Sequence, residues 1–268
     1  MSFPTTIYLS DDATKKTDSV KKWPLGTRGI TSDGRVFRYA LNGATALSVA
    51  HLVTRANVDN AEFSTGHYIS TELGTITTTW NYLDLYCTWD ESSTFQADKF
   101  ADGYLVTAGS TGQGQMVRIK GNTTGVGATT SQVVTINFKE DSRLSASITT
   151  AQEIALFLNP YRGTLVNLGT TCGKSILLGV APCAVAASKY YWLQTWGPCV
   201  MLGSAAVIGQ PLSQDVTTES SNSGYYQVWA HQTTDGTSGD WPLILGVCWG
   251  AGSGTALEPQ LVNLMLSP

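Results

Sequence analysis

The sequence predicts a mainly β protein, with a β-barrel or β-sandwich body, one short helix and an extended N-terminal arm. Three observations lead to this prediction. Short hydrophobic runs alternate at period two, the spacing at which side chains of a strand share one face. Turn-forming residues separate these runs. Charged residues make up 13% of the 268 residues, about half of the roughly 25% that is usual in soluble domains.

The first 25 residues differ from the rest of the chain and form the predicted arm (1–25). Seven charges fall between Asp11 and Lys22, a density typical of a solvated or extended segment. The arm also carries aromatic side chains without a periodic partner, namely Phe3, Tyr8 and Trp23. These side chains could pack on the chain's own domain or on a neighbouring subunit, and the sequence favours neither.

A β-hairpin is predicted next. The turn signal Asp33-Gly34 leads into a strand, because glycine takes positive φ readily and an Asp carboxylate accepts a bond from nearby backbone. Phe37, Tyr39 and Leu41 fall on one face of that strand. Asn42-Gly43 ends it.

Further strands are predicted along the remaining chain. Val134, Ile136 and Phe138 form an apolar stripe at period two, which indicates a strand with one buried face. Strand-like runs also cover 104–107, 115–120, 132–139, 163–166, 175–180, 190–196, 199–202, 225–229, 243–249 and 261–266. Their spacing favours a barrel or a sandwich.

One helix is predicted between Thr150 and Asn159-Pro160. Thr150 and Glu153 have the spacing of a capping box, and Asn159-Pro160 is a stop signal. The apolar positions between them follow a helical stripe: Ile154, Phe157 and Leu158. Residues 26–268 are expected to form one β-rich domain, or two lobes that meet near residues 145–160.

Charge and hydropathy disfavour several functional classes. The net charge of −4 provides no positive field for nucleic acid or an anionic membrane. The longest apolar run, residues 176–187, contains Pro182 and is shorter than the roughly 20 residues of a membrane span. No secretory leader is expected, because acidic residues interrupt the first 25 positions.

The five cysteines are widely spaced and lie among apolar neighbours: Cys87, Cys172, Cys183, Cys199 and Cys248. Paired CxxC motifs, which would indicate a zinc or redox site, do not occur. Buried reduced thiols are therefore the favoured interpretation.

No motif for catalysis or cofactor binding stands out. Residues 172–175 read Cys-Gly-Lys-Ser, but Leu168 occupies the position where a phosphate-binding loop needs glycine, and a strand-like run follows. The three histidines are far apart, and the acidic residues lack a calcium-loop pattern. We therefore expect no enzyme activity, no cofactor and no metal, although a fold-assembled pair of acids for a hydrolase stays open.

An aromatic ladder is the remaining candidate for function. Tyr190, Trp192 and Trp196 fall on one face of a predicted strand, with Tyr191 and Leu193 on the other. Such a ladder is more often core or subunit interface than a platform for sugars.

The order of several segments resembles structural proteins of tailed bacteriophages. Leu25-Gly26-Thr27-Arg28-Gly29 and the hairpin from Asp33 to Ala40 are similar to their opening. Residues 102–106 and 115–122 are similar to the middle of the same group. Late in the chain, residues 178–181, 190–197 and 245–247 are similar to the "GVA … YGWVQ … G … LGV" rhythm of phage decoration proteins, with Tyr191 in place of a glycine.

The resemblance implies a capsid decoration (cement) protein. It implies a β-barrel or β-tulip-like body that sits as an oligomer, often a trimer, on the outer capsid lattice. The expected partners are the major capsid protein and other copies of the chain, with no nucleic acid and no membrane. Such a protein is made in the host cytoplasm and located on the virion. The arm residues Phe3, Tyr8 and Trp23 and the ladder residues Tyr190, Trp192 and Trp196 are the expected capsid or subunit contacts.

Two alternatives remain open at this point. A receptor- or glycan-binding module of a phage tail or adhesin has the same Thr/Gly-rich β composition. A minor capsid or tail-tube component is also compatible with the sequence, and location on the particle separates it from cement.

Overall fold

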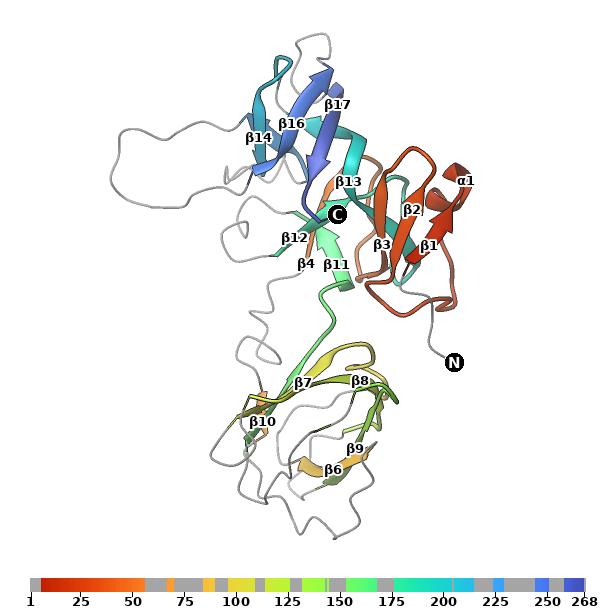
Figure 1. Cartoon of the computed structure of the whole chain (residues 1–268), viewed down its shortest axis with the longest axis vertical. Coiled ribbons are helices and arrows are strands. Elements are labelled where there is room, and N and C mark those ends of the chain that lie inside the picture. The colour runs from red at the N-terminus through yellow and green to blue at the C-terminus, as the bar shows by residue number, and fades with distance from the viewer. Residues whose placement is uncertain are drawn as a thin grey trace, which may run out of the picture. The chain divides into compact units, whose positions relative to one another are not determined.

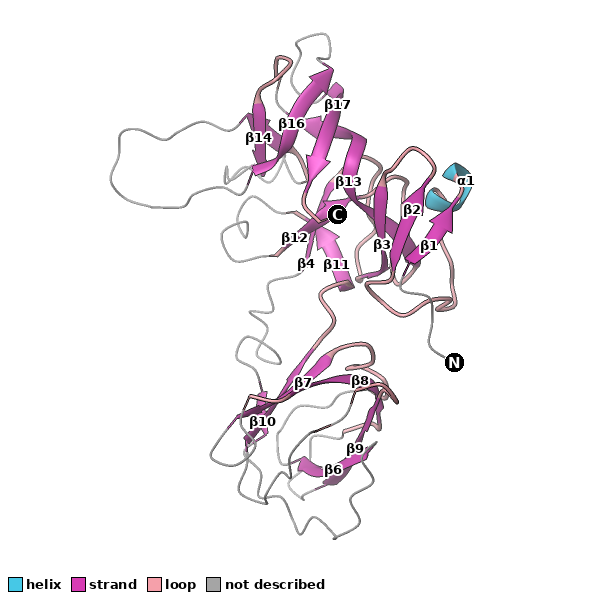
Figure 2. Cartoon of the chain, viewed as in Figure 1, coloured by secondary structure: helices cyan, strands magenta, loops and turns pink. Residues whose placement is uncertain are grey.

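The computed structural model describes residues 6–55, 67–69, 84–89, 96–108, 114–125, 132–142, 144, 153–167, 176–203, 205–214, 224–228, 244–250 and 258–267. The chain divides into two compact units, a body (Met1–Asn57 with Pro160–Pro268) and an insert (Val58–Asn159). Both consist of strands, and the described part contains one short helix (Figures 1 and 2). The predicted mainly β, barrel-containing fold is confirmed.

The body contains eleven strands in one connected sheet. In chain order these are β1 (Thr6–Leu9), β2 (Arg28–Thr31), β3 (Val36–Asn42), β4 (Leu52–Arg55), β11 (Arg162–Val166), β12 (Leu177–Val180), β13 (Tyr190–Gly203), β14 (Pro211–Gln214), β15 (Tyr226–Val228), β16 (Ile244–Gly250) and β17 (Glu258–Met265).

Two closed rings of five strands form within this sheet. The first barrel runs β3, β11, β4, β12 and β13, and closes because β13 pairs back with β3. The second barrel runs β13, β15, β14, β16 and β17, and closes because β17 pairs with β13. The 14-residue strand β13 belongs to both.

Each barrel has its own apolar interior. Tyr191, Leu193 and Val53 lie in the core of the first barrel. Met201, Leu245 and Val262 lie in the core of the second. Closed rings of this size are filled by side chains, so these interiors stabilise the fold and leave the outer walls for contacts.

The predicted hairpin is confirmed as β2 and β3, which are antiparallel neighbours. Gly34 has φ of 86° in the turn. Phe37 and Tyr39 are completely buried on one face of β3, and Leu41 packs beside them. Period-two spacing therefore located the buried face correctly.

The arm packs on its own body. Strand β1 pairs in parallel with β2, and Ile7, Leu9 and Trp23 pack against the cluster that contains Phe37 and Trp192. The short helix α1 (Asp11–Thr14) follows β1 in the chain, and the side chain of its N-cap Ser10 accepts a hydrogen bond from the amide of Ala13 at 3.3 Å.

The predicted helix between Thr150 and Asn159 is wrong. Residues Glu153–Phe157 form strand β10, which pairs with β5 (His67–Ile69) on one side and β7 (Tyr104–Ala108) on the other. Leu156 is 2% exposed and the adjacent Phe157 is 43% exposed, the alternation of a strand. Pairing of β10 on both edges outweighs the local helix signal. Thr150, the predicted cap of that helix, lies outside the described residues.

The insert forms a six-stranded sheet in the order β5, β10, β7, β8, β9 and β6. Its remaining strands are β6 (Asp84–Trp89), β7 (Tyr104–Ala108), β8 (Met116–Asn122) and β9 (Gln132–Phe138). The predicted stripe Val134, Ile136 and Phe138 lies in its core, as expected from period two.

Candidate functional site

The aromatic ladder begins as predicted. Tyr190 and Trp192 face the cluster under the arm, while Tyr191 and Leu193 face the first barrel's interior. Tyr190 stacks on Tyr39 with ring centroids 5.7 Å apart. Trp192 is 5% exposed, so it fills the chain's own core and leaves almost no surface for a sugar or another subunit.

The arm aromatics have different environments. Tyr8 is 86% exposed and points away from the core, so it is available for a contact. Trp23 is half-buried and packs on the body. Phe3 lies outside the described residues.

The alternation of side chains along β13 is interrupted before Trp196. The register between β13 and β3 shifts between Gln194 and Trp196, which marks a β-bulge. Gly197 follows with φ of 85°, a backbone conformation in which glycine is not strained. Bulges bend a strand and re-aim its side chains. Trp196 is thereby separated from Trp192 and reaches a hollow on the outer surface.

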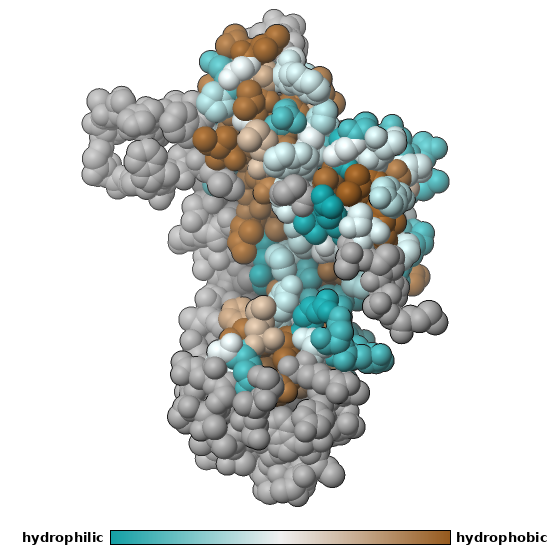
Figure 3. All heavy atoms as spheres, in the orientation of Figure 1, coloured by the Kyte–Doolittle hydropathy of each residue, from teal (hydrophilic) through white to brown (hydrophobic). Residues whose placement is uncertain are grey.

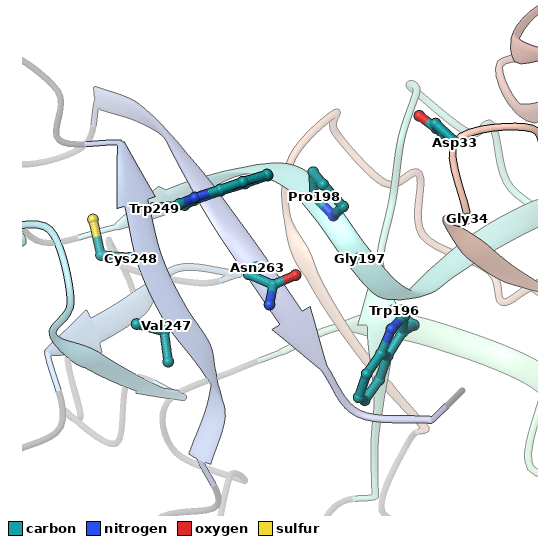
Figure 4. Close-up of a pocket in the computed structure, with 9 residues that line it drawn as sticks. All are labelled: Asp33, Gly34, Trp196, Gly197, Pro198, Val247, Cys248, Trp249 and Asn263. Carbon is teal, nitrogen blue, oxygen red and sulfur yellow. The ribbon is translucent and has the colours of Figure 1, made fainter.

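This hollow is the candidate site, with a volume of about 440 Å³. It lies within the body, where β13, β16, β17 and the hairpin turn meet (Figure 4). Its lining residues are Asp33, Gly34, Trp196, Gly197, Pro198, Val247, Cys248, Trp249 and Asn263. The volume falls within the roughly 300–1,000 Å³ of small-molecule sites.

A second bulge places Trp249 at the hollow. Cys248 pairs with Val262 of β17, but Gly250 already pairs with Leu261, so Trp249 is the extra residue of β16. Its side chain is 55% exposed and reaches toward Pro198 (Figure 4). Two independent bulges therefore direct two tryptophans to the same hollow.

Three polar groups of the hollow, unlike Asp33, are not used by the described part of the chain. Asn263 lies between Trp196 and Trp249 (Figure 4), and its side chain takes part in no hydrogen bond with the described residues. The same holds for both indole N–H groups. An amide offers two donors and an acceptor, and an indole one donor. These groups can therefore bond an incoming molecule without breaking an existing bond.

Asp33 provides a fixed negative charge at the edge of the hollow. One carboxylate oxygen accepts the hydroxyl of Thr31 at 2.5 Å, and the other accepts the Nε–H of Arg35 at 2.7 Å. These bonds, that of Thr31 first, keep the pKa of the Asp33 carboxyl below its ordinary value. Asp33 therefore stays ionised at neutral pH, and its remaining lone pairs face solvent.

The outer wall around the hollow is apolar and almost uncharged. Across the described stretches of the second barrel (196–203, 205–214, 224–228, 244–250 and 258–267), Glu258 is the one charged residue. Of thirteen exposed large apolar side chains among the described residues, seven lie there: Val200, Val207, Ile208, Ile244, Trp249, Leu261 and Met265. Brown residues gather in the region where Figure 1 draws β16 and β17 (Figure 3). Large exposed apolar surface usually marks an interaction site.

Nothing in the described residues supports a metal site, a membrane-spanning helix or a phosphate-binding loop. They contain no group of three or more His, Cys, Asp or Glu side chains arranged to hold a metal ion. Among the helices of this part of the chain, none has the length and hydropathy of a membrane span. Ile176–Val180, which follows the Cys-Gly-Lys-Ser segment, includes strand β12, whereas a phosphate-binding loop opens a helix.

Sequence reasoning did not single out Trp249 or Asn263. Both stand in runs that read as ordinary strands. The bulge that exposes Trp249 depends on which residues of β17 face β16, and no local pattern encodes that. The glycine after Trp249 is the one visible hint, since glycine within a strand is a frequent marker of a bulge.

Comparisons with protein-family models, curated protein sequences and solved structures find no match to this chain.

Proposed function

We propose that this chain is a non-enzymatic structural protein of a virus particle that decorates and stabilises the capsid by bridging capsomers. The observation that carries the proposal is the scarcity of charge in the described stretches of the second barrel, together with the seven exposed apolar side chains found there. A surface of this kind suits a lasting contact with another protein, because apolar residues are enriched at interface cores and charged residues are depleted.

The centre of the proposed contact is a pair of exposed apolar residues that lie directly opposite each other on neighbouring strands. Val200 on β13 lies opposite Leu261 on β17, and the two side chains are 50% and 41% exposed. Cross-strand neighbours have Cβ atoms about 5 Å apart. They form one continuous apolar patch that an incoming protein can cover in a single contact.

The proposed mechanism is mechanical. Several copies, a trimer by the phage resemblance, would each contact the major capsid protein, and many weak contacts together hold by avidity. Contacts made by apolar surface and backbone bonding persist in salt, whereas exposed ion pairs are screened. The proposed location is the capsid surface of the virion, after synthesis in the host cytoplasm.

Among the predicted arm contacts that the structure describes, Tyr8 is the one that stays exposed. Trp23, Ile7 and Leu9 are committed to the body, so removing residues 1–24 would strip β1 from β2 and expose the cluster beneath. Tyr8→Ala is the cleaner variant, because this side chain is 86% exposed and its loss leaves the packing intact.

The test is electron microscopy of purified particles with the protein localised on them. We expect density on the outer capsid surface, and we expect Leu261→Asp or Val200→Asp to lower occupancy at least about tenfold, since a buried unpaired charge is costly. Val49→Asp is the matched control, because Val49 is 53% exposed but lies outside the second barrel; its occupancy should not change. Localisation on the tail, or full occupancy with Leu261→Asp, would contradict the proposal.

A further inference from the structure

We infer that the hollow between Trp196 and Trp249 binds an uncharged saccharide. This inference goes beyond the proposed capsid role, although Trp249 belongs to both surfaces; titration of the free protein with sugars tests it separately from capsid occupancy. The hollow combines an aromatic face, uncommitted polar groups and a charged carboxylate.

The aromatic face is supplied by Trp249. Sugar rings present C–H groups on one face, and these pack against the π face of an exposed indole. Trp249 is 55% exposed because the bulge in β16 lifts it out of the paired ladder. A core tryptophan such as Trp192, at 5% exposed, cannot present its ring in this way.

The polar groups match the hydroxyls of a sugar. Asn263 and the two indole N–H groups supply donors and an acceptor, and none of them bonds to the described residues. Sites that orient small ligands have this composition, apolar walls with a few polar atoms that converge on the ligand. A purely apolar occupant would leave the amide of Asn263 covered and unpaired, which costs free energy.

The fixed charge narrows the ligand class. Asp33 borders the hollow, and Arg35 forms ion pairs with both Asp33 and Asp11, so this group of two carboxylates and one guanidinium keeps one formal negative charge. A carboxylate accepts hydrogen bonds from sugar hydroxyls but repels a ligand carboxylate or sulfate. The geometry therefore favours neutral sugars over sialylated, uronic or sulfated ones.

The backbone around the hollow is already arranged for binding. Gly34 and Gly197 both have positive φ, at 86° and 85°. A Cβ on Gly197 would lie 3.3 Å from the Cα of Arg35, a tight contact, so the positive φ and this close approach of the hairpin turn to β13 both favour glycine there. A site held by strands and a tight turn loses little conformational entropy on binding.

The experiment is titration of the full-length protein with maltose, lactose and chitobiose, followed by intrinsic tryptophan fluorescence and isothermal calorimetry. We expect at least one of these neutral disaccharides to bind, and sialyllactose to bind at least about tenfold more weakly than lactose if lactose is the ligand, because of the charge on Asp33. Absence of binding by all three neutral sugars, or tighter binding of sialyllactose, would overturn the inference.

Variants locate the binding. Trp249→Ala should weaken binding at least about tenfold, and Trp249→Tyr should retain most of it, because an aromatic face remains. Asn263→Ala should weaken binding without changing the circular dichroism spectrum. Tyr8→Ala, which removes an exposed aromatic ring from the arm, is the control and should bind as the unmodified protein does. Equal affinity of Trp249→Ala and the unmodified protein would show that the sugar binds elsewhere and would overturn the assignment.

Discussion

Cys199 and Cys248 flank Val262 in one row across the second barrel. Cys199 on β13 lies opposite Val262, and Val262 lies opposite Cys248 on β16. Two strand spacings separate the cysteines, about 10 Å, whereas a disulfide needs Cα atoms within about 7 Å. Both thiols are free and buried, so the predicted burial is confirmed for this pair.

These two thiols should be chemically inert in the folded protein. Burial raises the pKa of Cys199 to about 12 and also raises that of Cys248, so little thiolate forms at neutral pH. We expect mass spectrometry after iodoacetamide treatment to find both unmodified until denaturant is added. Cys183 is only half-buried and serves as the internal reference, which should react faster. Native labelling of Cys199 at the rate of Cys183 would contradict this prediction.

Two glycines on β16 should respond very differently to an added methyl group. A Cβ on Gly246 would lie 2.1 Å from the carbonyl oxygen of Asn263, whereas a Cβ on Gly250 would meet its nearest atom at 3.4 Å. Gly246→Ala should therefore lower the free energy of unfolding by about 2–3 kcal/mol, the upper range for overpacking. Gly250→Ala, the matched control, should change it by less than about 1 kcal/mol. Urea unfolding measures both, and equal stabilities would contradict the packing described.

Stability should fall between pH 10 and pH 12. Burial raises the pKa of Tyr39 from 10.0 to about 12, so the folded protein keeps this phenol neutral where the unfolded chain ionises it. The stabilisation is complete below pH 10 and is lost as pH rises toward 12. The pKa values of Tyr191 and Tyr226 are raised as well, again mainly by burial. Urea unfolding across this range should show the decline, with a shallower slope in Tyr39→Phe; constant stability would contradict it.

The ion pair between Lys139 and Asp102 should stabilise the insert. Their charged atoms are 2.8 Å apart, and the Asp102 side chain is 5% exposed. Asp102 has φ of 64°, which Asn tolerates, so Asp102→Asn removes the charge without new backbone strain. We expect a loss of about 1–3 kcal/mol, between the values for exposed and buried pairs.

The control for that pair lies in the same unit. Arg118 and Asp141 also form an ion pair, but their side chains are 45% and 59% exposed. Asp141→Asn should therefore change the free energy of unfolding by less than about 0.5 kcal/mol. Equal effects of Asp102→Asn and Asp141→Asn in urea unfolding would show that burial does not set the strength of these pairs.

Strand faces that carry a regular apolar stripe could be predicted from sequence. Phe37 and Tyr39, the stripe at Val134, and the faces of Tyr190 to Leu193 all obey period two, because each lies on a wall with a packed side. The helix predicted near Glu153 failed for the opposite reason. There the capping signal was local, but the pairing partners of β10 lie far away in the chain.

Features that depend on register could not be predicted. Strand β13 continues through Gly197 and Pro198, which read as an end of a strand, because Pro198 lies opposite Asn263 of β17. Trp249 was read as a routine strand residue, and the bulge beneath it follows from pairing with Leu261 and Val262. The insertion of residues 58–159 is also invisible locally, since both strands that border it, β4 and β11, pair with each other.

Strand β13 has a mechanical consequence. Its first part pairs with β3 and its second part with β17, so one strand runs through both barrels. A force applied at Leu261 would pass through the hydrogen bonds between β17 and β13 into a strand that is extended on both sides of its bulge at Gln194–Trp196. The force then acts as shear along the ladder of hydrogen bonds between β13 and β3, at Phe37 and Tyr39. These bonds share the load, so they must break together and not one after another.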